Sequence, residues 1–139
     1  MPMPIARPSS AALLLACLLA ANGAAAQPAG QLDHVAACRL DPETVALRFT
    51  FEGGACQEPG EATLEDAGGG IGNVTVPTEE TAEICTMQIV PVQFAAELAA
   101  GEDYTTFDIT VLDPQGEVQA LGSAGIVQAG LECGDVPPN

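Results

Sequence analysis

The stretch that decides the fold is Val45-Ala46-Leu47-Arg48-Phe49-Thr50-Phe51, in which large apolar and other side chains alternate. Successive side chains of an extended strand point to opposite faces, so one face carries only the apolar set: Val45, Leu47, Phe49 and Phe51. Asp41-Pro42 supplies a turn before this strand, and Gly53-Gly54 ends it. The segment therefore predicts a β-strand with one buried face.

The same alternation returns at residues 104–112, where Phe107, Ile109 and Val111 share a face and Asp108 and threonines occupy the other. A polar face this regular indicates one solvated side, as in an antiparallel sheet that covers a single core. Asp113-Pro114-Gln115-Gly116 has proline at the second and glycine at the fourth position, which predicts a type I turn after this strand.

Weaker strand candidates are residues 35–40, 61–65, 73–76, 84–92, 116–121 and 126–131. Pro91 cannot donate a backbone hydrogen bond, so its strand is expected at a sheet edge or bulged there. Residues 94–100 fit a strand or a short helix, and we favour the strand because so short a helix is marginal without tertiary support. The pattern predicts an all-β protein, an antiparallel sandwich of about seven or eight short strands.

The N-terminus has the layout of a secretory signal peptide over residues 1–26, with Arg7 before an apolar run that is too short to span a bilayer. Ala24-Ala25-Ala26 provides a small-residue cleavage site. The segment that ends at Cys17 resembles a bacterial lipobox, but the lengths of the leader regions favour cleavage after Ala26 over a lipid anchor at Cys17. We expect a periplasmic or secreted protein without a membrane span.

Cleavage leaves a length typical of one domain, which we divide into a flexible lead-in at 27–33, a single domain at 34–133 and a tail at 134–139. The domain contains an even number of cysteines, which an oxidising compartment would convert into two disulfides. Three connectivities are open. We favour Cys38–Cys133, which would join the first strand to the last, and Cys56–Cys85, which would join the end of one strand to the start of another.

The charge is one-sided, because the 139 residues contain 19 acidic side chains and three cations. Arg7 would leave with the leader, so only Arg39 and Arg48 oppose the 19 acids, for a formal charge of −17. Such a surface repels phosphate backbones and anionic headgroups, which argues against nucleic-acid and membrane-surface roles. It is compatible with a cationic protein partner, or with solubility alone.

The strand that ends in Gly53-Gly54-Ala55-Cys56 is followed by an acidic hairpin and the segment Cys85-Thr86-Met87-Gln88-Ile89-Val90-Pro91. Over residues 44–112 this order resembles small exported bacterial immunoglobulin-like sandwich proteins. The resemblance implies an immunoglobulin-like fold and a Cys56–Cys85 bond, and it carries no activity. Because the Cys56–Cys85 bond would join two strands with apolar faces, Met87 and Ile89 are expected to meet Phe49 and Phe51 inside the core.

The sequence contains only weak candidates for a catalytic or metal-binding site. His34 is the only histidine and Ser123 the only serine after the leader, so a serine triad would require both. Carboxylate pairs sit in polar turns, where solvated acids normally lie: Glu65-Asp66, Glu79-Glu80 with Glu83, and Glu102-Asp103. The glycine-rich run at residues 68–73 lacks the Lys-Ser/Thr of a phosphate loop. We expect no cofactor.

The leading hypothesis is a non-enzymatic exported module with a structural or protein-binding role. A second hypothesis is an inhibitor or sequestering partner of a cationic secreted protein such as a lysozyme, because the charge would steer a basic partner. A third uses the acidic clusters for calcium binding or carbohydrate processing.

Overall fold

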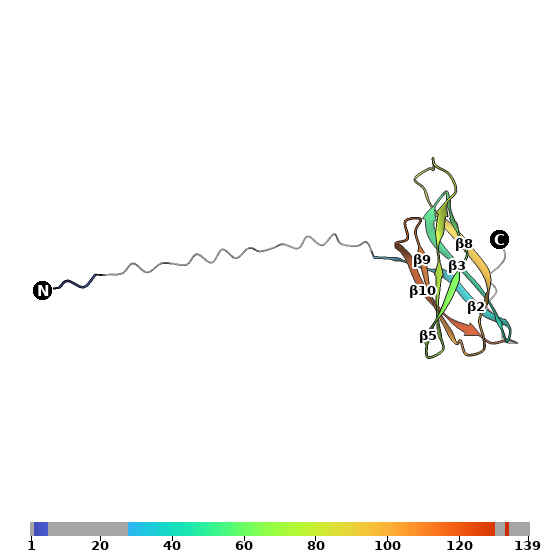
Figure 1. Cartoon of the computed structure of the whole chain (residues 1–139). Coiled ribbons are helices and arrows are strands. Elements are labelled where there is room, and N and C mark those ends of the chain that lie inside the picture. The colour runs from blue at the N-terminus through green and yellow to red at the C-terminus, as the bar shows by residue number, and fades with distance from the viewer. Residues whose placement is uncertain (1, 6–27, 130–132, 134–139) are drawn as a thin grey trace.

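The computed structural model describes residues 2–5, 28–129 and 133. The part of the chain that it describes is all-β and contains ten strands (Figure 1). Their bounds are β1 Gly30–Gln31, β2 Asp33–Asp41, β3 Thr44–Gly54, β4 Gln57–Pro59, β5 Thr63–Gly68, β6 Ile71–Val76, β7 Thr78–Glu80, β8 Ile89–Ala99, β9 Thr106–Leu112 and β10 Val118–Val127. Within these residues, no helix has the length and apolarity needed to cross a membrane.

Seven strands follow the order β5-β6-β9-β10-β2-β3-β8, β1 pairs with β10, and β4 pairs with β7 in a separate small ladder. The longest register is that of β3 with β8, from Thr44 opposite Ala99 to Gly54 opposite Ile89. The predicted turn after β9 is present, because the amide of Gly116 donates to the carbonyl of Asp113 at 2.9 Å. The all-β prediction is confirmed.

The sheet is mixed, which corrects the expectation of a purely antiparallel arrangement. β6 runs parallel to β9, β10 runs parallel to β2 over two residue pairs, and β1 runs parallel to β10. Parallel neighbours need long crossovers, and here the chain leaves β6, completes β7 and β8, and returns as β9. Alternation within a strand reports which face is buried but not the direction of its neighbour, so the sequence pattern could not show this.

A single hydrophobic core draws side chains from strands far apart in the sheet order. Val74 and Val76 of β6 belong to the same buried cluster as Phe94 and Leu98 of β8. The sheet therefore curves over one core, because strands from the two ends of its order contribute to it. The apolar face predicted for β3 is confirmed, since its four members are at most 2% exposed: Val45, Leu47, Phe49 and Phe51.

β8 lies at one edge of the sheet and pairs only with β3, as the proline at position 91 predicts. Residues 94–99 belong to this strand, so the preference for a strand over a helix is confirmed. The strand expected at 84–92 begins only at Ile89, and residues 81–88 form a loop without regular structure. β8 is thus one long edge strand that follows an irregular loop.

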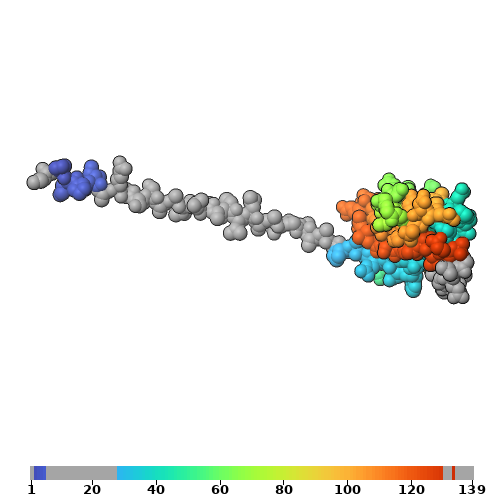
Figure 2. Space-filling model, turned by 90° about the horizontal axis from the view of Figure 1, so that it is seen from below, coloured from blue at the N-terminus to red at the C-terminus, as the bar shows by residue number. Residues whose placement is uncertain are grey.

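The first and last strands of the domain lie side by side, as Figure 2 shows for the light blue and orange-red parts of the chain. Residues 116–121 and 126–131 were expected to be two strands, whereas β10 runs continuously from Val118 to Val127. Paired backbone begins at Gly30, ahead of the domain start expected at residue 34. The described residues exclude most of the leader, with Cys17, and also residues 130–132 and the whole tail at 134–139.

Two ends of the domain can be defined from the register. The Cys56–Cys85 end comprises residues 52–61, 77–90 and 112–119, where β3 and β9 finish and β8 and β10 start. The Arg39 end comprises residues 39–44, 68–71 and 99–106, where β2 and β8 finish and β3, β6 and β9 start. In Figure 1 the loop 81–88 (yellow-green) projects at the top, and the turn between β5 and β6 lies at the bottom.

Candidate functional site

Both favoured disulfides are formed, with Cα–Cα separations of 5.8 Å for Cys38–Cys133 and 5.9 Å for Cys56–Cys85. Cys38 belongs to β2, so this bond ties β2 to the chain after β10. Cys56 lies in the turn after β3, and Cys85 lies in the loop before β8. The second disulfide therefore fixes the loop 81–88 to the chain just after β3.

Three large apolar side chains on and beside this loop are exposed to solvent. Ile84 is 93% exposed, Met87 is 101% exposed, and Ile89 is 71% exposed. The expectation that Met87 and Ile89 meet Phe49 and Phe51 in the core is therefore wrong. Their places opposite β3 are taken by Phe94 and Val92, which are the register partners of those two phenylalanines.

The two-residue period of β8 explains why Ile89 does not reach the core. Phe94 and Leu98 are buried, and Val92 and Ala96 are half-buried, so the inward positions are the even-numbered ones. Ile89 is odd-numbered and points outward, and Met87 precedes the strand altogether. A one-residue difference in phase exchanges the two faces of a strand, so these aliphatic groups end on the outside.

A network of side-chain amides forms the base of this end. The Gln57 side chain accepts a hydrogen bond from the amide of Gly54 at 2.9 Å and donates to the Thr78 hydroxyl at 2.7 Å and to the Gln119 carbonyl oxygen. Thr78 is 4% exposed, and its hydroxyl donates to the carbonyl of Leu112 at 2.7 Å. The network joins β3, β4, β7, β9 and β10, so the loops at this end extend from strands that are hydrogen-bonded to one another.

The loop 81–88 is also hydrogen-bonded to the turn after β3. The backbone amide of Thr81 donates to the carbonyl of Cys56 at 2.8 Å, and its hydroxyl reaches the same oxygen at 3.1 Å. Together with the disulfide at Cys85, these contacts hold both sides of the residues 82–84. The exposed aliphatic groups are thus displayed on an anchored loop.

Carboxylates surround the loop. Glu79 and Glu80 lie on β7 and Glu83 on the loop, and all three are exposed. Glu58 of β4 stands directly opposite Glu79 in the β4–β7 ladder, which places two like charges side by side. Beside the loop is a hollow of about 800 Å³, whose lining includes Glu52, Ile89, Asp113, Glu117 and Val118.

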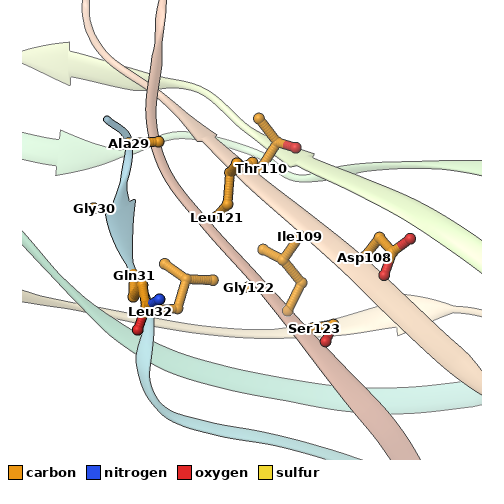
Figure 3. Close-up of a pocket in the computed structure, with 10 residues that line it drawn as sticks. All are labelled: Ala29, Gly30, Gln31, Leu32, Asp108, Ile109, Thr110, Leu121, Gly122 and Ser123. Atoms are coloured by element: carbon orange, nitrogen blue, oxygen red, sulfur yellow. The ribbon is translucent and has the colours of Figure 1, made fainter. Parts of the chain in front are cut away.

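A second hollow lies between β1 and the strands β9 and β10 (Figure 3), with a volume of about 580 Å³. Ser123 and Asp108 are register partners there, and both belong to its lining. His34, the histidine that a triad would need, is exposed in β2 and does not line this hollow. Its backbone adopts a positive φ of 51°, between the register positions Asp33 and Ala36, where β2 is irregular against β3.

The remaining acidic pairs lie on other elements than Glu79, Glu80 and Glu83. Glu65-Asp66 lie on β5, and Glu102-Asp103 lie in the turn before β9 at the Arg39 end. In the described part of the chain, no three side chains among His, Cys, Asp and Glu are grouped as a metal site would require. The glycine-rich run forms a hairpin turn, with φ of 85°, 65° and 82° at Gly68, Gly69 and Gly70, and continues into β6.

Arg39 has a structural position that the sequence did not indicate. Its side chain is 6% exposed, and its guanidinium donates to the carbonyls of Ala100 at 2.9 Å and Gly101 at 2.7 Å. It also reaches the carbonyls of Asp41 at 3.2 Å and Tyr104 at 3.5 Å. One of the two arginines of the domain is therefore used to close the turn after β8, and the charge count alone could not reveal this.

Comparison with protein-family models, with curated proteins and with solved structures gives no match to this chain.

Proposed function

We propose that this protein is an exported, non-enzymatic, immunoglobulin-like β-sandwich module that binds another protein. The observation that carries the proposal is the exposure of Ile84 and Met87 on a loop fixed by a disulfide, and of Ile89 directly after it. Large aliphatic side chains that are exposed close together along the chain indicate an interaction site, because leaving them in water does not stabilise the isolated domain.

Export to the periplasm or beyond is supported by two independent features. Residues 1–26 have the layout of a signal peptide, and the domain carries two disulfides, which persist in oxidising compartments. The immunoglobulin-like assignment is supported by the single core beneath a curved sheet and by the resemblance over residues 44–112. The parallel pairing of β1 and β2 with β10 makes this a variant of the purely antiparallel sandwich.

The non-enzymatic part of the proposal rests on where the candidate groups lie. Glu79, Glu80 and Glu83 are at the Cys56–Cys85 end, and Glu102 and Asp103 are at the Arg39 end. General acid–base chemistry on a glycosidic bond needs two carboxyl groups facing one cleft, with one of them kept protonated by burial. The carboxylates of these two clusters are exposed and lie at opposite ends of the domain, so they do not meet that requirement.

The test is capture by the mature protein, residues 27–139, from the exported proteins of its own host. The matched control is the variant Ile84→Ser/Met87→Ser/Ile89→Ser, which leaves every buried position unchanged. We expect a protein that the wild type retains and the variant does not, verified with both components purified. Identical retention by the two forms would refute the proposal. So would a hydrolytic activity that disappears in Glu80→Gln.

A further inference from the structure

We propose that the Cys56–Cys85 end is the docking surface for a basic protein, with Ile84, Met87 and Ile89 in contact with an apolar patch on that partner. The surrounding carboxylates then face lysine and arginine side chains at the rim of the patch. This inference rests on the proposed function and names both the surface and the chemical class of the partner.

The apolar part of the argument comes from size and placement. Three side chains with exposed fractions of 93%, 101% and 71% lie within six positions of one another at one end of the molecule. Val118, which is 51% exposed, shares the lining of the neighbouring hollow with Ile89. Methionine adapts its shape to an opposing surface, which suits a contact residue at the centre of such a group.

A disulfide and two hydrogen bonds hold the loop 81–88 in place before any partner binds. Cys85 is bonded to Cys56, and Thr81 is hydrogen-bonded to the carbonyl of Cys56 through both its amide and its hydroxyl. Beneath them, the amides of Gln57 and Gln119 and the hydroxyl of Thr78 connect five strands. A loop held in this way loses less conformational entropy on association than a free one, which favours affinity.

The charge of this end selects the class of partner. Its segments contain eight acidic side chains and no lysine or arginine: Glu52, Glu58, Glu61, Glu79, Glu80, Glu83, Asp113 and Glu117. A basic protein is attracted to such a surface during diffusion and an acidic one is repelled. The class of the partner follows from this sign.

The ladder of β4 with β7 gives a second, local reason to expect a basic partner. Glu58 and Glu79 are directly opposite each other, an arrangement that destabilises an antiparallel pair. A lysine or arginine placed between the two carboxylates would replace repulsion by attraction. The hollow lined by Glu52, Asp113 and Glu117 also contains Ile89 and Val118, and this combination suits the aliphatic stem and cationic head of such a side chain.

The experiment is site-specific photo-crosslinking in the host that exports the protein, with the full chain. A benzoylphenylalanine photo-crosslinker is placed at position 87 in one strain and at position 40 in a second strain. Leu40 is 49% exposed at the Arg39 end and is the matched control. We expect position 87 alone to crosslink to one protein, and we expect that protein to be rich in lysine and arginine.

The crosslinked protein is then purified and its affinity measured against charge variants with equal net charge. Glu58→Gln/Glu79→Gln removes two charges at the docking surface, and Glu102→Gln/Asp103→Asn removes two at the Arg39 end. We expect the first to weaken binding about tenfold and the second to leave it unchanged. Binding should also weaken steeply between about 0.05 and 0.5 M salt.

Each other result overturns the inference. Crosslinking from position 40 in place of 87 refutes the surface, although the protein would still bind a partner. A partner captured at position 87 whose affinity ignores salt and Glu58→Gln/Glu79→Gln refutes the basic class. No crosslink at either position refutes the docking surface, and the proposed function then stands or falls by the capture experiment alone.

Discussion

The two ends of the domain use their side chains in opposite ways. At the Arg39 end, a buried guanidinium donates to backbone carbonyls of the turn after β8, and the amide of Ala100 donates to the carbonyl of Glu43 at 2.8 Å. At the Cys56–Cys85 end, the comparable fixing groups are an amide network and a disulfide, and large aliphatic groups lie outside them in water. The first end is closed on itself, whereas the second presents apolar surface on a fixed support.

The largest effect is expected from opening the disulfides one at a time. Cys38→Ser/Cys133→Ser releases a sequence separation of 95, and Cys56→Ser/Cys85→Ser one of 29. Chain-entropy reasoning gives losses of about 4–5 and about 3–4 kcal/mol in the free energy of unfolding. Denaturant titration of both variants measures them.

Sequence reasoning alone makes the Cys56–Cys85 bond the more important one, because it places Met87 and Ile89 in the core. Their exposure removes that reason, so the longer loop should now cost more. A larger loss in Cys56→Ser/Cys85→Ser would show that the loop contributes to core stability. The Cys56–Cys85 end would then be stabilised by its loop in the way that the Arg39 end is stabilised by its guanidinium.

The second prediction concerns Arg39→Met, which keeps the length and apolar stem of the side chain but removes its donors. The carbonyls of Ala100 and Gly101 lose their charged partner, and we expect a loss of about 2–4 kcal/mol in the free energy of unfolding. Arg39→Lys should lose less, because an ammonium retains the charge and part of the bonding. Equal stability of Arg39→Met and wild type would contradict the closure of this end by the guanidinium.

The third prediction tests how tightly the strands leading from the Arg39 end are packed. A Cβ at Gly72 of β6 would lie 2.6 Å from Cδ1 of Leu64 and 3.1 Å from carbons of Phe107 and Tyr104. Gly72→Ala should therefore lower the free energy of unfolding by about 1–3 kcal/mol through overpacking. Gly101→Ala is the control, since its Cβ would meet nothing within 4 Å. Thermal unfolding of the two variants should differ clearly, and coincident midpoints would argue against this packing.

The parts of the fold that the sequence predicted are those that depend on local alternation. β3 and β9 each place an apolar set on one face, and Leu47, Phe51 and Phe107 are at 0% exposure as expected. Pro91 correctly indicated an edge, because a missing amide hydrogen has the same consequence in any sheet. The direction of neighbouring strands depends on contacts between distant segments, so the parallel pairs of β10 were not predictable from alternation.

The candidate surface was missed for a related reason. Ile84, Met87 and Ile89 look like core residues by composition, but Ile89 falls on the outward face of β8, and Ile84 and Met87 lie in the loop before that strand. The phase of β8 was readable at Phe94 and Leu98, which are both even-numbered, but further apolar residues as far back as Ile84 hide where the strand begins. Arg39 was missed because its partners are backbone carbonyls about 60 positions away.

The smallest effect is expected from Ile84→Ser/Met87→Ser/Ile89→Ser. These side chains are already in water, so their loss should change the free energy of unfolding by about 0.5 kcal/mol or less. The contrasting variant is Leu98→Ala in the same strand β8, where the side chain is 7% exposed and belongs to the core. It should lose about 2–4 kcal/mol by creating a cavity.

Denaturant titration under one condition measures both losses in the free energy of unfolding. The two losses can be compared directly, because both changes concern aliphatic groups in or just before one strand. If the three serines cost as much as Leu98→Ala, the loop packs against the domain in solution, and its side chains are structural. If they cost almost nothing, the domain folds without any contribution from them. Three large aliphatic groups on an anchored loop then have no role in folding, and contact with a partner is the role that remains for them.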